Sequence, residues 1–172
     1  GASRLLTLVG PPGVGKTRLA IQAAASLVDD YGDGLCYVAL ATVCDPALVP
    51  AAIAGTVGVN ETPGQSLASR LKTYLAEKHL LLVLDNFEHV GVAAPFLGEL
   101  LEACPWLTIM VTSRTPLRIR GERQYAVVPL LTPAGEPETV EPTELLRYSA
   151  VALFVERSQA GRSAFTLTRE NA

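Results

Sequence analysis

The segment GPPGVGKT, residues 10–17, constrains the fold of this chain more than any other feature. It directly follows the apolar run Leu5–Val9 and leads into an alanine-rich stretch. The fixed positions of the pattern G-x-x-x-x-G-K-[ST] are occupied by Gly10, Gly15, Lys16 and Thr17. A strand, a tight loop and a helix in this order cradle a phosphate, because loop N–H groups and the positive helix end face one anion. The sequence therefore predicts a P-loop.

Each part of this segment has a predicted role. We expect the three glycines Gly10, Gly13 and Gly15 to let the loop backbone turn inward around the β-phosphate, where a Cβ would force the loop open. Lys16 is expected to bridge the β- and γ-phosphate oxygens, and the Thr17 hydroxyl to face Mg²⁺. The predicted nucleotide-binding residues are Gly10, Pro12, Gly13, Val14, Gly15, Lys16, Thr17 and Arg18.

Further short apolar runs predict the rest of a parallel sheet. These runs span residues 35–40, 80–84, 107–111 and 125–128. Most are almost wholly apolar, which is typical of parallel strands that are covered on both faces. Two helical patterns lie between them, one through Leu67, Leu71, Tyr74 and Leu75, the other through Val92, Phe96, Leu97, Leu100 and Leu101. Strands that alternate with helices indicate an α/β fold.

The end of the chain has a different organisation. We predict a nucleotide-binding core over residues 1–131, then an acidic, proline-rich linker over residues 132–148. Ser149 offers an N-cap for a helix through about Gln159, so residues 149–172 read as the beginning of a helical subdomain. Residues 168–171 resemble the first turn of another helix, at which the sequence stops. We therefore expect this chain to be a fragment of a longer protein.

Composition argues against several other classes of protein. The net charge of −3 does not suit a surface built to neutralise nucleic-acid phosphates. The longest apolar runs are far shorter than the roughly 18 residues of a membrane-span candidate. The three cysteines form no C-x-x-C pair, which is typical of thiols in a reducing compartment. We expect a cytoplasmic protein that contacts neither a membrane nor nucleic acid through this segment.

A metal-binding acid is expected at the end of a strand neighbouring the P-loop. Asp85 follows the run LLLVL and would contact Mg²⁺ through water, the Walker B role. An Asp after an apolar strand is weak evidence for a metal-binding acid by itself, but strong evidence in a chain that also contains a P-loop. Glu88 is the nearest carboxylate that could polarise an attacking water, although a solvated loop acid is an equally good interpretation.

Arg114 follows the predicted strand at residues 107–111, in the stretch Thr112-Ser113-Arg114. If this strand lies beside the strand of Asp85, Arg114 can reach the γ-phosphate and sense its presence. The alternative is a solvated cluster formed with Arg118, Arg120 and Arg123. The predicted catalytic residues are Lys16, Asp85, Glu88 and Arg114, and the predicted metal ligands are Thr17 and Asp85.

Four blocks resemble, in order, the nucleotide-binding domain of STAND-class signalling ATPases, relatives of NB-ARC domains, most closely those of bacterial transcriptional regulators. The blocks are GPPGVGKTRLA, LLVLDNFEHV, VTSRTPLRIRGERQYAVVPL and AVALFVERSQA. The resemblance implies a five-stranded parallel sheet of the ASCE P-loop type, ATP or ADP with Mg²⁺, and a switch function. It also implies that Lys16 and Thr17 bind phosphate and metal, that Asp85 is the Walker B acid, and that Arg114 senses the phosphate.

The chain departs from the family pattern in two places. Many members have a second acid directly after the Walker B aspartate, where this chain has Asn86, so we expect slow hydrolysis. The family's G-L-P-L motif and winged-helix region would lie beyond Ala172. Expected partners are these other domains, sensor or output domains, and a second copy in nucleotide-dependent self-association. The alternatives are a P-loop phosphotransferase, an AAA-like ATPase, and a degenerate scaffold that binds no nucleotide.

Overall fold

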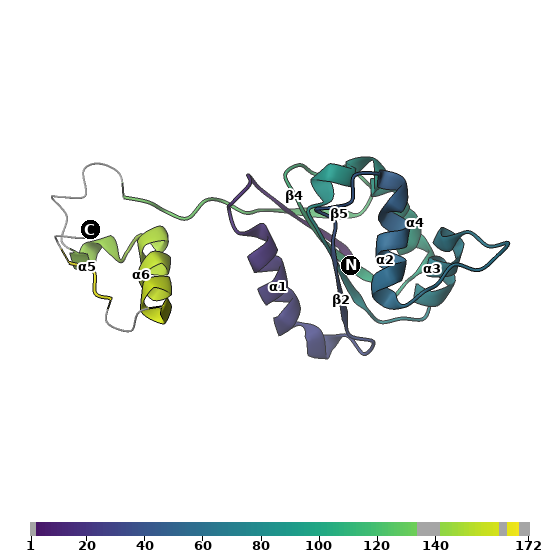
Figure 1. Cartoon of the computed structure of the whole chain (residues 1–172), viewed down its shortest axis with the longest axis horizontal. Coiled ribbons are helices and arrows are strands. Elements are labelled where there is room, and N and C mark those ends of the chain that lie inside the picture. The colour runs from purple at the N-terminus through teal and green to yellow at the C-terminus, as the bar shows by residue number, and fades with distance from the viewer. Residues whose placement is uncertain (1–2, 134–141, 162–164, 169–172) are drawn as a thin grey trace. The chain divides into compact units, whose positions relative to one another are not determined.

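The structure is a computed structural model that describes residues 3–133, 142–161 and 165–168 (Figure 1). The chain forms two compact units, residues 1–127 and 128–172. The first unit is built on a five-stranded sheet with the order β2-β3-β4-β1-β5, and each pair of neighbouring strands in it is parallel. The strands are β1 Leu5–Val9, β2 Leu35–Ala39, β3 Leu81–Asp85, β4 Thr108–Ser113 and β5 Glu122–Ala126.

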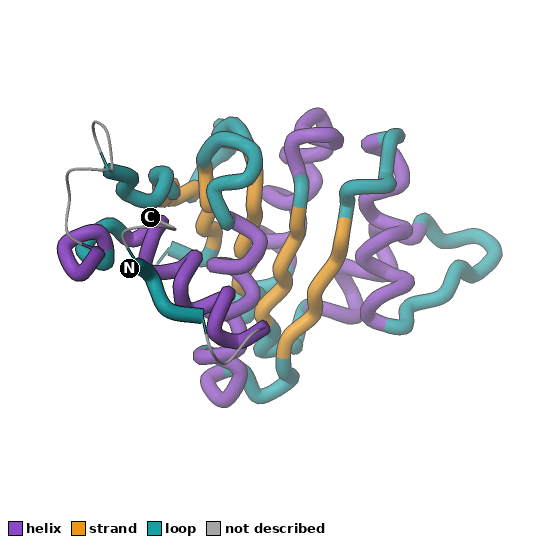
Figure 2. The backbone as a smooth tube through the Cα atoms, turned by 60° about the vertical axis from the view of Figure 1, so that its left-hand side comes forward, coloured by secondary structure: helices purple, strands orange, loops and turns teal. Residues whose placement is uncertain are grey.

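Helices cover both faces of this sheet (Figures 1 and 2). The α-helix α1 lies on one face, and α2, α3 and α4 lie on the other. The helices of this unit are α1 Lys16–Ser26, α2 Val49–Val57, α3 Leu67–Leu75 and α4 Ala94–Ala103, with short 3₁₀ turns η1 Val28–Asp30, η2 Pro46–Leu48 and η3 Phe87–Ala93. The predicted α/β P-loop fold with a parallel sheet of five strands and flanking helices is therefore confirmed.

Two apolar clusters account for the continuous apolar runs in the sequence. The larger cluster packs β3 and β4 against α2, α3 and α4, and the smaller one packs the opposite face of the sheet against α1. All five residues of β3 are buried, because this strand lies inside the sheet with side chains covered on both faces. The buried residues of the smaller cluster are Ala20 and Ala24 of α1, and Leu8, Leu81, Val83 and Met110 of the sheet.

Some local features differ from the sequence-based expectation. Strand β5 begins at Glu122, three residues before the predicted start, because its exposed polar residues leave no apolar run to mark an edge strand. Helix α2 was not predicted from the sequence; its Pro50 stands in the first turn, where proline is tolerated. Val92 is 84% exposed and lies in η3, so it does not share the buried face of α4.

The second unit contains α5 Pro142–Leu145 and α6 Ser149–Gly161. The predicted helix from Ser149 is present, and the Ser149 hydroxyl accepts a hydrogen bond from the Leu131 N–H at 2.9 Å. Residues 134–141 of the predicted linker, and residues 169–171 of the predicted helix start, lie outside the described residues, whereas residues 142–145 of the linker form α5. Within the described ranges, none of the helices has the length and apolar character needed to span a bilayer.

Candidate nucleotide-binding site

The loop between β1 and α1 has the backbone conformation of an anion cradle. Gly13 and Gly15 have φ values of +78° and +95°, in the left-handed region where a Cβ is strained. Gly10 is required for a different reason from the one expected. A Cβ there would lie 2.5 Å from the Val127 carbonyl oxygen, so this glycine makes room for the chain that follows β5.

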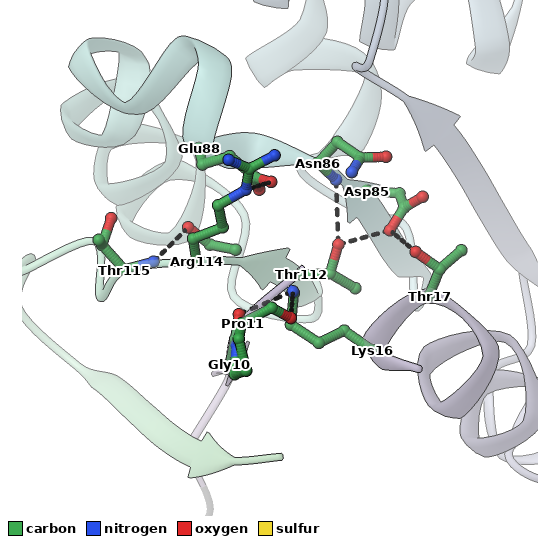
Figure 3. Close-up of polar contacts among 11 residues, drawn as sticks. Gly10, Pro11, Lys16, Thr17, Asp85, Asn86, Glu88, Thr112, Arg114 and Thr115 are labelled. Atoms are coloured by element: carbon green, nitrogen blue, oxygen red, sulfur yellow. Dashed lines mark hydrogen bonds and ion pairs between the residues drawn. The ribbon is translucent and has the colours of Figure 1, made fainter. Parts of the chain in front are cut away.

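Lys16 is the first residue of α1, and its ammonium group points back into the loop (Figure 3). Its Nζ donates hydrogen bonds to the Gly10 carbonyl at 2.8 Å and to the Pro11 carbonyl at 2.9 Å. The first turn of α1 contains no acidic residue, so no side chain there offsets the positive end of the helix dipole. Both the ammonium and the helix end therefore favour an anion at this loop.

Asp85 ends β3 and is only 4% exposed. Its Oδ1 accepts hydrogen bonds from the Thr17 hydroxyl, at 2.8 Å, and from the Thr112 hydroxyl. Its Oδ2 accepts one from the Tyr37 hydroxyl at 2.8 Å. Thr112 in turn accepts a hydrogen bond from the Asn86 N–H at 3.0 Å. Three hydroxyl donors thus replace the water that this buried carboxylate has lost.

The sequence did not predict roles for Tyr37 and Thr112. Thr112 stands in the polar stretch at the end of β4, which is a signal that could have identified it. Tyr37 is the one residue with a phenolic hydroxyl in the run LCYVAL, but nothing local indicates its partner. Burial, and then the hydrogen bond to Asp85, raises the pKa of Tyr37 to about 12, so the hydroxyl remains a donor at neutral pH.

The oxygen atoms at Thr17 and Asp85 fit a Mg²⁺ ion that arrives with a nucleotide. Mg²⁺ is usually held by one or two carboxylates together with waters and substrate phosphates. The Thr17 hydroxyl donates a hydrogen bond to Asp85, which leaves the lone pairs of the hydroxyl oxygen available to a metal. No group of three or more His, Cys, Asp and Glu side chains that could hold a metal occurs among the described residues. The donor set therefore suits a metal that phosphate oxygens help to bind.

Glu88 and Arg114 form an ion pair at the same opening (Figure 3). The Arg114 Nε donates to Glu88 Oε1 at 3.0 Å, joining η3 to the residue that follows β4. The Glu88 side chain is 10% exposed and the Arg114 side chain is 52% exposed. The other oxygen of Glu88, Oε2, is buried and has no hydrogen-bond partner among the described residues.

A pocket of about 490 Å³ brings most of the predicted site together. Its wall includes Pro12, Gly13, Gly15, Lys16, Thr17, Arg18, Glu88 and Arg114 of the predicted residues, and also Ile21, Gln22 and Asn86. Gly10 and Val14 are not part of this wall, and Asp85 lies behind it in contact with Thr17. The volume is in the range of small-molecule sites. Residues from α1, η3 and the end of β4 thus converge on one cavity.

Known proteins resemble this chain in sequence and in fold. The profile of a family described as an AAA domain matches residues 1–122. The protein named "Putative HTH-type transcriptional regulator Rv0890c" of Mycobacterium tuberculosis is 39% identical over 171 residues, 99% of this chain and 18% of that protein. "Uncharacterized protein Rv0894" of the same species is 34% identical over 170 residues, 98% of this chain and 40% of that protein.

The crystal structure of Cdc6p from Pyrobaculum aerophilum is similar in fold, with a TM-score of 0.54 and 16% sequence identity. The similarity covers 70% of this chain and 38% of Cdc6p. The chain spans less than half the length of either mycobacterial relative. Because the family profile covers most of the 172 residues, including the P-loop and Asp85, this chain belongs to the AAA domain family of P-loop ATPases.

Proposed function

We propose that this chain binds ATP or ADP with Mg²⁺, hydrolyses ATP slowly, and acts as the nucleotide switch of a larger bacterial regulator. The observation that carries the proposal is the contact between Thr17, directly after the P-loop lysine, and Asp85 at the end of β3. This contact supports the proposal because it brings the glycine-rich loop and the acid at the end of β3 to one opening. Membership of the AAA domain family supports the proposal that a nucleotide binds at that opening.

The residues of the loop would hold the phosphates. Backbone N–H groups of the loop would donate to phosphate oxygens, and Lys16 would turn its ammonium from the Gly10 and Pro11 carbonyls toward the β- and γ-phosphates. Thr17 and Asp85 would hold Mg²⁺, which when bound neutralises charge on the phosphates. Thr17 would use its hydroxyl oxygen, and Asp85 would act through water.

Arg114, paired with Glu88, would detect whether the bound nucleotide carries a γ-phosphate. A ligand shifts a conformational equilibrium only by the difference in its affinity for the two states. Arg114 has its Nε committed to Glu88, and its terminal nitrogens are the atoms that would meet a γ-phosphate. ADP lacks that group. The ion pair between Arg114 and Glu88 is therefore the proposed contact through which the site distinguishes ATP from ADP.

The proposed setting is a larger cytoplasmic signalling protein. The name of one relative is that of a transcriptional regulator, and this chain corresponds to 18% of its length. The four sequence blocks that resemble STAND-class ATPases support the same setting. The proposed partners are the other domains of such a protein, a C-terminal winged-helix region among them, and a second copy in nucleotide-dependent self-association.

Asp85→Asn tests the proposed metal site. The amide keeps the size of the side chain but loses the negative charge, so we expect Mg²⁺ to stop strengthening ATP binding. A lost charge-assisted contact corresponds to about tenfold or more in affinity. ATP affinity is measured by calorimetry with Mg²⁺ and with EDTA. Asp33→Asn, at an exposed carboxylate that pairs with Lys78, is the control. Should the variant at residue 85 respond to Mg²⁺ as the wild type does, the metal is held elsewhere.

Arg114→Ala tests the readout of the third phosphate. We expect ATP affinity to fall about tenfold, the value of one charge-assisted hydrogen bond, and ADP affinity to stay unchanged. Both affinities are measured by calorimetry. Arg123→Ala, at an exposed position in β5, serves as the matched control. An equal loss for both nucleotides, or no loss for either, would show that Arg114 does not sense the γ-phosphate.

A further inference from the structure

Tyr37 approaches Asp85 from the edge of the sheet. Strand β2 pairs with β3 so that Tyr37 lies opposite Val83 and Ala39 lies opposite Asp85. Because side chains alternate between the faces of a strand, Tyr37, Val83 and Asp85 share one face, the face toward α1. The tyrosine ring lies along this face beside Val83, and its hydroxyl reaches Asp85 Oδ2 at 2.8 Å. An edge-strand side chain thus contacts the carboxylate of the proposed metal site.

The two carboxylate oxygens of Asp85 accept different numbers of hydrogen bonds. A carboxylate offers about four acceptor positions, two on each oxygen. Oδ1 accepts from Thr17 and from Thr112, so both of its positions are taken. Oδ2 accepts from Tyr37. Among the contacts of the described residues, three of the four acceptor positions are therefore taken. The fourth position lies on Oδ2, the oxygen that accepts from Tyr37.

The terminal torsion of an aspartate is soft, and the two hydrogen bonds to Oδ1 restrain it through one oxygen only. The hydrogen bond from Tyr37 restrains the same torsion through the second oxygen, Oδ2. We propose that Tyr37 is a positioning residue for the metal site: its hydroxyl orients Asp85 so that the last acceptor position of Oδ2 receives a water ligand of the Mg²⁺ that accompanies the nucleotide. This inference rests on the proposed Mg²⁺–nucleotide function of the site.

Tyr37→Phe removes the hydroxyl and keeps the ring beside α1 and Val83. We expect the Mg²⁺ concentration that half-maximally strengthens ATP binding to rise about two- to tenfold, the range of one hydrogen bond. ATP affinity in EDTA should equal that of the wild type, which also shows that the variant is folded and its P-loop intact. Binding is followed with a fluorescent ATP analogue during Mg²⁺ titration, and by electron paramagnetic resonance of Mn²⁺ with saturating ADP.

The control is Tyr74→Phe, which makes the same chemical change at an exposed position on α3. A hydroxyl that only satisfies a buried carboxylate would change protein stability equally with and without the metal, and would leave the Mg²⁺ midpoint where it is. An unchanged midpoint in Tyr37→Phe therefore overturns the proposal, as does a loss of ATP affinity that is the same in EDTA and in Mg²⁺.

Asp85→Asn in the same titrations separates this inference from the proposed function. If Asp85→Asn abolishes the response to Mg²⁺ while Tyr37→Phe behaves as the wild type, the metal site stands and the role of Tyr37 is wrong. If the wild type itself binds ATP without any response to Mg²⁺, the proposed function fails and the role of Tyr37 fails with it.

Discussion

Lys16→Ala is expected to weaken ATP binding about 10- to 100-fold, because a charge-assisted hydrogen bond to phosphate contributes about 1.5–3 kcal/mol. The ammonium is nearly buried at the mouth of the P-loop, where its contacts replace water. Calorimetry with Mg²⁺ and ATP measures the effect. Unchanged affinity would contradict the assignment of residues 10–17 as the phosphate-binding loop.

The structure adds a complication to this experiment. Lys16 also donates to the Gly10 and Pro11 carbonyls, so alanine removes contacts that hold the empty loop as well as a phosphate ligand. Lys16→Met keeps most of the side-chain volume but loses both the charge and the N–H donors, and it should weaken ATP binding by a similar factor. Lys72→Ala, at a half-buried lysine paired with Glu99, controls for loss of positive charge. Thermal unfolding of the variants without nucleotide then measures how much the hydrogen bonds from Lys16 to the two loop carbonyls stabilise the empty loop.

The parts of the fold that were predictable are those whose signal is local. Strand β1 has the predicted bounds, and β3 was placed within one residue, because burial on both faces leaves a predominantly apolar run. The spacing of Lys16 and Thr17 within the P-loop pattern is also local, so it identified the loop. Strand β5 lacked such a signal because it is exposed on both faces, where it carries polar residues such as Arg123 and Gln124.

The candidate site was predictable as a set of residues but not as a set of contacts. Glu88 and Arg114 were assigned separate roles, yet they are ion-paired although 26 residues separate them. Their proximity follows from the pairing of β3 with β4, which the sequence only implies. Tyr37 reaches Asp85 across 48 residues through the pairing of β2 with β3. No local pattern marks these two long-range contacts.

Glu88→Gln is expected to reduce single-turnover ATP hydrolysis by about 10²–10⁴, the contribution of a general base, and to leave ATP affinity nearly unchanged. Glutamine is close in size and keeps an oxygen that can accept from the Arg114 Nε, but it cannot take a proton. Asn86, which follows Asp85 directly, cannot act as a base either, so wild-type turnover should already be slow.

The two oxygens of Glu88 explain how it could hold Arg114 and orient water at once. Oε1 accepts from the Arg114 Nε, whereas Oε2 is buried and has no partner among the described residues. A hydrogen bond from a water would stabilise such an oxygen, since leaving a buried acceptor unpaired costs about 1–3 kcal/mol of stability. Rates are measured by rapid quench with enzyme in excess, and Glu99→Gln, at an exposed carboxylate on α4, is the control. A rate equal to that of the wild type would mean that Glu88 only positions Arg114, and that the attacking water is oriented by another part of the larger protein or by a second copy.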